Sequence, residues 1–165
     1  LFSSYRMMHL VAEGLTTQMD YPVYMQGQMS KRIILEKFTR HGNAVLLGTA
    51  SFWEGVDVRG STLSCVIIDK LPFAAPDDPL LQAKMQDCQM QGKDPFAHIQ
   101  LPQAVIALKQ GVGRLIRDNK DKGVLVICDN RLVTRQYGQV FLKSLPPMRR
   151  TRSLEDANTF LKHIN

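Results

Sequence analysis

Cysteine is scarce in this 165-residue sequence, and its three copies lie far apart at Cys65, Cys88 and Cys128. They are odd in number, form no C-x-x-C pair and have no cluster of histidines nearby, which argues against a disulfide framework and against a metal site in this chain. A protein with so few cysteines fits a reducing cytosol most simply.

Long apolar runs are also lacking, since none approaches the roughly 20 residues that a membrane-spanning helix needs. We therefore expect no membrane partner. The sequence opens on Leu1-Phe2-Ser3, without an initiator methionine, a charged leader or a small-residue cleavage site. This opening predicts that the chain is a piece of a longer protein.

The glycine-rich loops that usually hold a nucleotide are missing as well. The pattern G-x-x-x-x-G-K-[ST] fails because Asp94 follows Gly92-Lys93 and the first glycine of the pattern is missing. G-x-G-x-x-G fails because Ile116 stands at the third glycine position. The chain can thus touch a nucleotide but lacks the usual means of holding one. This combination predicts a composite site, with arginines supplied across an interface.

Positive charge, by contrast, is in excess. Lysine and arginine total 21 against 15 aspartate and glutamate, which gives a formal net charge of +6. Such a balance favours an anionic partner, with nucleic acid or a nucleotide ahead of a membrane surface. The length suits one compact domain.

Apolar periodicity predicts helices that alternate with short strands. Strands are expected at 22–25, 44–47, 62–68 and 124–128, and helices after Ser3 or Ser4, from Ser30 to Gly42, and over 80–90, 102–116, 137–145 and 153–164. We expect the strand at 44–47 to be buried on both faces and the strand at 124–128 to be the most clearly buried one. This order predicts an α/β domain with a largely parallel sheet, in which ligands bind at the carboxyl ends of the strands.

The stretch 110–117, Q-G-V-G-R-L-I-R, is the main candidate for function. Pro102 can start the helix that leads into it. If that helix runs through both glycines, an apolar stripe faces the core and Gln110, Arg114 and Arg117 share the opposite face, with Gly113 at its edge. Guanidinium groups match phosphate in a bidentate way. The alternative is an amphipathic helix with a solvated polar face and glycines that mark a break. The predicted apolar stripe comprises Val105, Leu108, Val112, Leu115 and Ile116.

Two further segments follow predicted strands. After the strand at 44–47, Thr49 and Ser51 could donate to phosphate, and Asp57 could bind a ribose hydroxyl or orient an arginine. Trp53 could stack on a base, although core packing is the more common role of a tryptophan. The segment Ser3-Ser4-Tyr5 has two interpretations, a helix cap and a phosphate contact.

Several of these segments resemble helicase motifs. The stretch 110–117 resembles motif VI of superfamily 2 helicases, 51–57 (S-F-W-E-G-V-D) resembles motif V of the XPD/DinG branch, and 1–5 is similar to a truncated motif IV. Residues 121–131 match the D-x-G, strand, D-x-R segment of that branch, and 70–79 resembles a loop of bacterial DinG-like proteins. The resemblance covers nearly the whole chain, in the correct order and spacing.

The resemblance implies that residues 1–165 form the second RecA-like lobe of an ATP-dependent 5′-to-3′ DNA helicase of repair or replication. The expected fold is a three-layer α/β domain with helices on both faces of the sheet, and residues 146–165 form a basic connector and a terminal helix. In that family the Walker motifs and the iron–sulfur cysteines belong to the other lobe. ATP with Mg, single-stranded or forked DNA and the bacterial cytosol with its nucleoid are then implied.

The resemblance also assigns roles to residues. Arg114 and Arg117 would contact the γ-phosphate that Gln110 senses, and the remaining assignments are ATP binding by Glu54, Gly55, Asp57 and Gly113 and DNA binding by Ser4, Tyr5, Thr49 and Ser51. Gly111 departs from the alanine that is more usual in motif VI. The basic tail follows no family pattern, and a repair or replication protein could bind there.

Two other classes of function compete with this one. A nucleic-acid-binding or partner-docking module would explain the positive charge without any catalytic role. A metabolic α/β enzyme would need a complete cofactor loop, which is missing.

Overall fold

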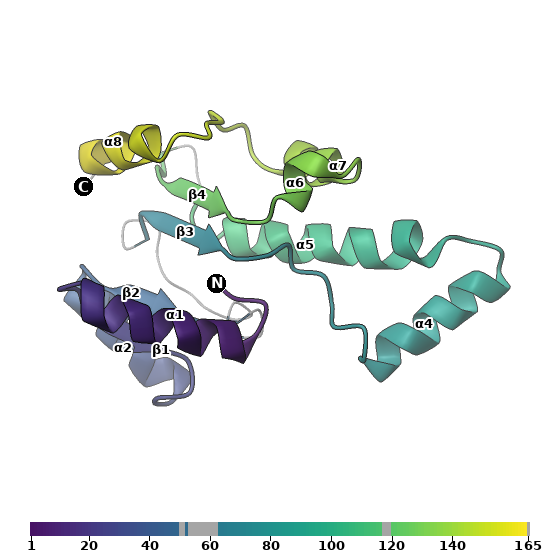
Figure 1. Cartoon of the computed structure of the whole chain (residues 1–165), viewed down its shortest axis with the longest axis horizontal. Helices are drawn as coiled ribbons and strands as arrows, with labels where there is room; N and C mark the ends of the chain where they lie inside the picture. The colour runs from purple at the N-terminus through teal and green to yellow at the C-terminus, as the bar shows by residue number, and fades with distance from the viewer. Residues whose placement is uncertain (50–51, 53–62, 117–119, 165) are drawn as a thin grey trace.

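The computed structural model describes residues 1–49, 52, 63–116 and 120–164, and Figure 1 shows the arrangement of their helices and strands. The order of elements is α1 (Tyr5–Gln18), β1 (Val23–Met25), α2 (Lys31–His41), β2 (Val45–Leu47), β3 (Cys65–Ile68), α4 (Pro79–Met90), the π-helical turn η2 (Phe96–Gln100), α5 (Leu101–Val112), β4 (Val124–Ile127), α6 (Arg131–Thr134), α7 (Gly138–Ser144) and α8 (Leu154–Ile164).

The sheet is parallel throughout its described part. β1 pairs with β2 from Val23 opposite Val45, and β3 pairs with β4 from Cys65 opposite Val124. The first two residues connect these pairs: Phe2 forms a parallel bridge with Thr49. On the other side the Leu1 amino group donates to the Ile67 carbonyl at 2.6 Å. Residues 1–2 therefore lie between the two strand pairs, and the order across the strands is β1, β2, residues 1–2, β3, β4.

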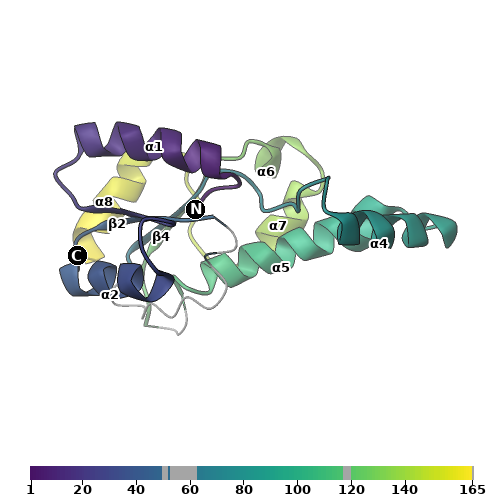
Figure 2. The same cartoon turned by 90° about the horizontal axis from the view of Figure 1, so that it is seen from below.

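Helices cover both faces of this sheet. Figure 2 shows α1 on one side of the strands and α2 and α5 on the other. The mixture of helix and parallel strand confirms the predicted α/β class with its three layers.

Two apolar clusters hold the layers together. The larger one joins β3, α5 and α7 through side chains that are almost fully buried, among them Ile68, Leu108 and Phe141. The smaller one places Ile34 and Phe38 of α2 against Phe52. Gly48 allows this contact, because a Cβ at that position would lie 3.0 Å from the Phe52 ring.

The expected burial of the strands at 44–47 and 124–128 is wrong. In β2 only Leu47 is buried, and all four residues of β4 are half-buried. In β3 burial alternates, with Val66 at 5% and Ile68 at 1% exposed but Ile67 at 52%. Side chains of a strand point alternately to its two faces, so the core covers one face of β3 more completely than the other.

Short-range caps agree with the sequence. The Ser4 hydroxyl accepts a hydrogen bond from the Met7 N–H at the start of α1, and Ser153 caps α8 by accepting from Asp156 N–H. Gly42 ends α2 with a φ of 74°, a conformation that a residue without Cβ adopts at little cost.

The helix that leads to α5 begins earlier than predicted. Pro102 lies in the first turn of α5, but η2 precedes it without interruption. The Asp94 carboxylate accepts from the N–H groups of Phe96 and Ala97 and so caps this start. Pro102 therefore does not begin the helix.

Helix α4 and the turn after it project from the body of the domain, whereas α8 lies beside β4 at the other end (Figures 1 and 2). Within the described ranges, no helix combines the length and the apolarity required to cross a bilayer.

Candidate nucleotide and DNA interfaces

The stretch 110–117 does not continue as one helix. α5 ends at Val112, and Gly113 is its cap. The N–H groups of Arg114 and Leu115 then bond three residues back, to Gly111 and Val112, in tight turns. The expectation that the helix runs through both glycines is wrong, because the chain tightens at Gly113. Helical spacing therefore supports a shared polar face only as far as Val112, where α5 ends.

The predicted apolar stripe is nevertheless packed. Leu108, Val112 and Leu115 are at most 1% exposed, and Val105 and Ile116 pack against the same cluster while half-buried. Gly111 is buried on this packed side, whereas Gly113 is exposed.

Arg114 is the unusual residue of the segment. Its side chain is half-buried, and its Nε atom is shielded from solvent yet has no hydrogen-bond partner among the described residues. A buried donor without a partner costs about 1–3 kcal/mol, and more if it is charged. Most such groups in native proteins have a partner, so the Nε of Arg114 lacks a hydrogen bond that buried donors usually form.

Tight packing fixes the backbone next to Arg114. The neighbouring Leu115 is fully buried against Gly123, where an added Cβ would lie 2.4 Å from a Leu115 methyl carbon and 3.1 Å from the Ser64 carbonyl oxygen. Ser64 and Gly123 directly precede β3 and β4. Leu115, Ser64 and Gly123 therefore mark the amino edge of the sheet, and Arg114 is the residue next to this edge.

At the opposite edge, where the parallel strands end, polar side chains bond to one another. We call this the carboxyl edge and define it by Ser3, Gln26, Thr49, Asp69 and Asp129. Gln26 follows β1 directly, and its Oε1 accepts from the backbone N–H of Thr49 at 2.8 Å and from the Thr49 hydroxyl at 3.0 Å. The amide group donates to the Tyr5 hydroxyl at 2.6 Å.

The predicted DNA-binding residues of the first segment lie on the carboxyl edge as well. Tyr5 is 52% exposed, whereas Thr49 is only 7% exposed. Ser4 acts as the cap of α1, which leaves its hydroxyl proton available. Ser3 donates from its N–H and its hydroxyl to the Asp69 carboxylate at 2.8 and 3.0 Å.

An ion pair completes the carboxyl edge beyond β4. The Asp129 carboxylate accepts from the Leu71 N–H at 2.9 Å and from the Arg131 guanidinium at 2.6 Å. Burial of Asp129 acts to raise its pKa, but the hydrogen bonds from Arg131 and from the backbone outweigh burial and lower the pKa to about 2. Arg131 also lies 5.4 Å from the Phe73 ring.

Five predicted site residues lie outside the described residues: Ser51, Glu54, Gly55, Asp57 and Arg117. Trp53 does too. The structure brings Tyr5 and Thr49 together through Gln26, with Ser4 beside Tyr5, and it places Gln110 as an exposed residue near the end of α5.

Neither Gln26 nor Asp69 was predicted from the sequence as a site residue. Both directly follow strands, so a systematic search of strand ends for polar residues could have found them. Asp129 follows the strand at 124–128 and lies in the segment that matches a family pattern, but its hydrogen bond to the loop at Leu71 was not predicted.

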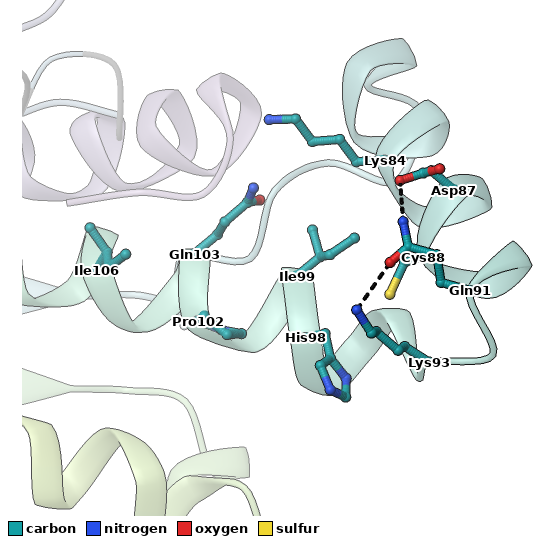
Figure 3. Close-up of a pocket in the computed structure, with 10 residues that line it drawn as sticks. All are labelled: Lys84, Asp87, Cys88, Gln91, Lys93, His98, Ile99, Pro102, Gln103 and Ile106. Atoms are coloured by element: carbon teal, nitrogen blue, oxygen red, sulfur yellow. Dashed lines mark hydrogen bonds between the residues drawn. The ribbon is translucent and has the colours of Figure 1, made fainter.

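A pocket of about 440 Å³ lies away from these residues, between α4 and the helix formed by η2 and α5. Figure 3 shows Lys84, Cys88 and His98 among its lining side chains, with Gln91 bonded to Asp87 and to Lys93. The pocket contains none of the predicted site residues.

Parallel strands with helices on both faces form the α/β core of this domain. The sequence pattern of the Helicase C-terminal domain family matches residues 1–148, and the chain belongs to this family. The predicted resemblance to XPD/DinG helicases is thereby confirmed.

Relatives of known name extend this finding. The chain is 62% identical to "ATP-dependent DNA helicase YoaA" of Escherichia coli K12 over 98% of its own length and 25% of that protein. It is 38% identical to "ATP-dependent helicase DinG" of Mycobacterium tuberculosis H37Rv over 99% of its own length and 25% of the relative. The chain thus spans about a quarter of the length of the curated relatives it matches.

A solved XPD helicase chain has the same fold. It superimposes on 87% of this chain, and on 26% of itself, with a TM-score of 0.65 at 23% sequence identity. This likeness agrees with the RecA-like class expected from the sequence.

Proposed function

We propose that this chain is the C-terminal motor lobe of an ATP-dependent 5′-to-3′ DNA helicase of DNA repair or replication in the bacterial cytosol. The lobe supplies arginines to an ATP held mainly by the preceding lobe of the same protein. Residues 1–165 form this lobe, and 146–165 are its basic connector and last helix. The proposal extends the names of the relatives to the whole protein that contains this chain.

One observation supports the nucleotide role above all others, namely the shielded and unpartnered Nε of Arg114. A planar guanidinium offers donors in a fork that fits two oxygens of a phosphate. The packing of Leu115 against Gly123 keeps the backbone beside it in place. An incoming phosphate would therefore meet a donor whose position is set before binding, and such preorganisation lowers the barrier for a transferring phosphoryl group.

Within this proposal Arg114 and Arg117 contact the γ-phosphate, Gln110 senses it, and Glu54, Gly55, Asp57 and Gly113 line the cleft. ATP supplies the energy of translocation when it is bound. The residues that hold its Mg, and the cysteines of a 4Fe-4S cluster, are assigned to the preceding part of the protein. These assignments come from the motifs in the sequence.

The DNA role is assigned to the carboxyl edge. Ser4, Tyr5, Thr49 and Ser51 are proposed to face a single strand or the single-stranded arm of a fork. The net charge of +6 supports such a partner, because phosphate contacts dominate affinity for nucleic acid. ATP and DNA would then be bound at different places, which a motor needs in order to couple one to the other.

The test uses the full-length protein and two matched substitutions. Arg114→Lys keeps the positive charge but loses the planar fork, and Arg135→Lys makes the same change at an exposed residue of the same chain. DNA-stimulated ATP hydrolysis should fall by at least about 100-fold in the first variant and stay within about twofold in the second. Strand displacement from substrates with a 5′ or a 3′ single-stranded arm tests the polarity.

The alternative function is a non-catalytic module that binds nucleic acid or docks a partner at the basic tail. It predicts DNA binding without ATP hydrolysis, and equal behaviour of the two arginine variants. That outcome would displace the helicase proposal.

A further inference from the structure

The carboxyl edge contains a hydrogen-bond chain whose direction can be worked out from its ends. It runs from Thr49 through Gln26 to Tyr5, three residues from separate segments. A backbone N–H can only donate, so the Gln26 atom that receives the Thr49 N–H must be the oxygen. This fixes the orientation of the amide, which is otherwise ambiguous in side chains of this type.

The other hydrogen bonds of this network follow from the orientation of the Gln26 amide. The Gln26 oxygen is an acceptor only, so the Thr49 hydroxyl spends its single proton on it, at 3.0 Å. The other end of the amide is then NH₂, which donates to the Tyr5 oxygen at 2.6 Å. A phenolic oxygen that accepts this bond keeps its own proton. Among the described residues, no acceptor is recorded for that proton.

The hydroxyl groups of Thr49 and Tyr5 also differ in their exposure to solvent. Thr49 is 7% exposed, and its proton points inward to Gln26. Tyr5 is 52% exposed and is the first residue of α1, which has no acidic residue in its first turn. The amino end of a helix carries partial positive charge, which favours an anion near the start of α1.

We propose that Gln26 is a positioning residue for DNA, which orients the Tyr5 hydroxyl as a hydrogen-bond donor to a backbone phosphate while Thr49 anchors the Gln26 amide from inside. This inference rests on the proposed function, since it assumes that the carboxyl edge binds a single strand. It changes the role of Thr49 from a direct phosphate donor to the anchor of the chain. Tyr5 becomes the direct contact.

The experiment uses the full-length protein and reverses the direction of the hydrogen bond between Gln26 and Tyr5. In Gln26→Glu the carboxylate still accepts from the Thr49 N–H and hydroxyl, but it cannot donate to Tyr5. The Tyr5 hydroxyl would donate to the carboxylate instead and lose its proton for phosphate. Gln28→Glu is the matched control, because Gln28 is exposed and uses only its oxygen, which accepts from the Met25 N–H at 3.0 Å.

Binding of fluorescein-labelled oligothymidine by anisotropy is the main readout. Gln26→Glu should raise the Kd about tenfold, the size expected for one lost hydrogen bond to a charged group, whereas Gln28→Glu should change it by no more than about twofold. The DNA concentration that gives half-maximal ATP hydrolysis should rise by the same factor. The rate at saturating DNA should not change, which separates a positioning role from a loss of folded protein.

Tyr5→Phe provides a second route that leaves Gln26 intact. It removes the proposed donor without adding charge, and it should weaken binding by about the same factor. Adding Gln26→Glu to Tyr5→Phe should cost no more than Gln28→Glu does. Equal Kd values for Gln26→Glu and Gln28→Glu, or full additivity of the Gln26 and Tyr5 changes, would overturn the inference while leaving the helicase proposal in place. Failure of the parent protein to bind oligothymidine would overturn both.

Discussion

The two edges of the sheet treat their polar groups in opposite ways. At the carboxyl edge Gln26, Asp69 and Asp129 each bond to partners from distant parts of the chain. Next to the amino edge, the shielded Nε of Arg114 has no partner in the described part of the chain. The carboxylates and the amide of the carboxyl edge are thus bonded within the fold, whereas the shielded Nε of Arg114 is a donor without a partner in the described part of the chain.

This difference teaches how stability and function are divided in the lobe. A buried polar group that is fully bonded rigidifies the fold, whereas one that lacks its partner costs stability until a ligand supplies it. The carboxyl edge should thus respond to substitution mainly through stability or DNA affinity. Substitution of Arg114 should affect mainly catalysis.

Arg114→Ala provides the largest expected effect and the sharpest test of the contrast. In the full-length protein, ATP turnover should fall about 10³-fold, the lower end of the range for an arginine that stabilises a transferring phosphoryl group. The free energy of unfolding should not fall, because the substitution removes a shielded donor whose missing partner costs stability in the parent. Steady-state phosphate release and chemical denaturation measure the two quantities. Turnover within a few-fold of the parent would remove Arg114 from the γ-phosphate.

Asp129→Ala should behave in the reverse manner. It leaves the Leu71 N–H and the Arg131 guanidinium without their shared acceptor, and we expect a loss of about 2–3 kcal/mol in the free energy of unfolding. ATP turnover per folded molecule should stay within about threefold of the parent. Urea denaturation followed by circular dichroism checks the first value. A stable but catalytically inactive Asp129→Ala would break the division between the two edges.

Acid should weaken the carboxyl edge selectively. The folded-state pKa of Asp129, about 2, lies below its ordinary value of 3.8, so its contribution is complete above about pH 5 and is lost as the pH falls toward 2. A difference of nearly two pKa values corresponds to about 2 kcal/mol. The free energy of unfolding of the parent and of Asp129→Asn, measured at a series of pH values, isolates the contribution of the Asp129 carboxylate. The variant should lose less stability than the parent over the same range, and parallel curves would contradict the assignment.

Ser4→Ala should give the smallest effect, because Ser4 has one local bond. Loss of the bond from the Met7 N–H to its hydroxyl should cost about 1 kcal/mol. If Ser4 also donates to a phosphate, the affinity for single-stranded DNA should fall as well, by up to about tenfold. Thermal denaturation and a DNA titration separate the two roles. Ser153→Ala, which removes the corresponding cap of α8, serves as the control that should change stability alone.

Much of the fold could be predicted because it depends on neighbours in the sequence. The cap at Ser4, the end of α2 at Gly42 and the packed positions Leu108, Val112 and Leu115 all involve residues within a few positions of one another or a helical period. The helicase family was recognisable for a similar reason, since its motifs are contiguous stretches.

The errors occurred where the surrounding structure overrides a local pattern. A helical period carried through Gly113 predicted one long polar face, but α5 ends at Val112 and the chain turns so that Leu115 can pack against Gly123. Similarly, an apolar run at 124–128 suggested full burial, whereas β4 is half-buried. An apolar run predicts that a strand forms, but the burial of that strand depends on which elements cover each of its faces.

By itself, then, the sequence determined the α/β order of elements, the caps at Ser4, Gly42 and Ser153, the apolar stripe that begins in α5 and the family to which the chain belongs. Only the tertiary structure decided that Gln26 reaches Thr49 across 23 positions, that Asp129 reaches Leu71 across 58 and that Ser3 reaches Asp69 across 66. These contacts follow from the order in which parallel strands lie side by side. A pattern of alternating residues indicates a strand but carries no information about its neighbours, so the partners of polar groups at strand ends emerge only when the sheet has assembled.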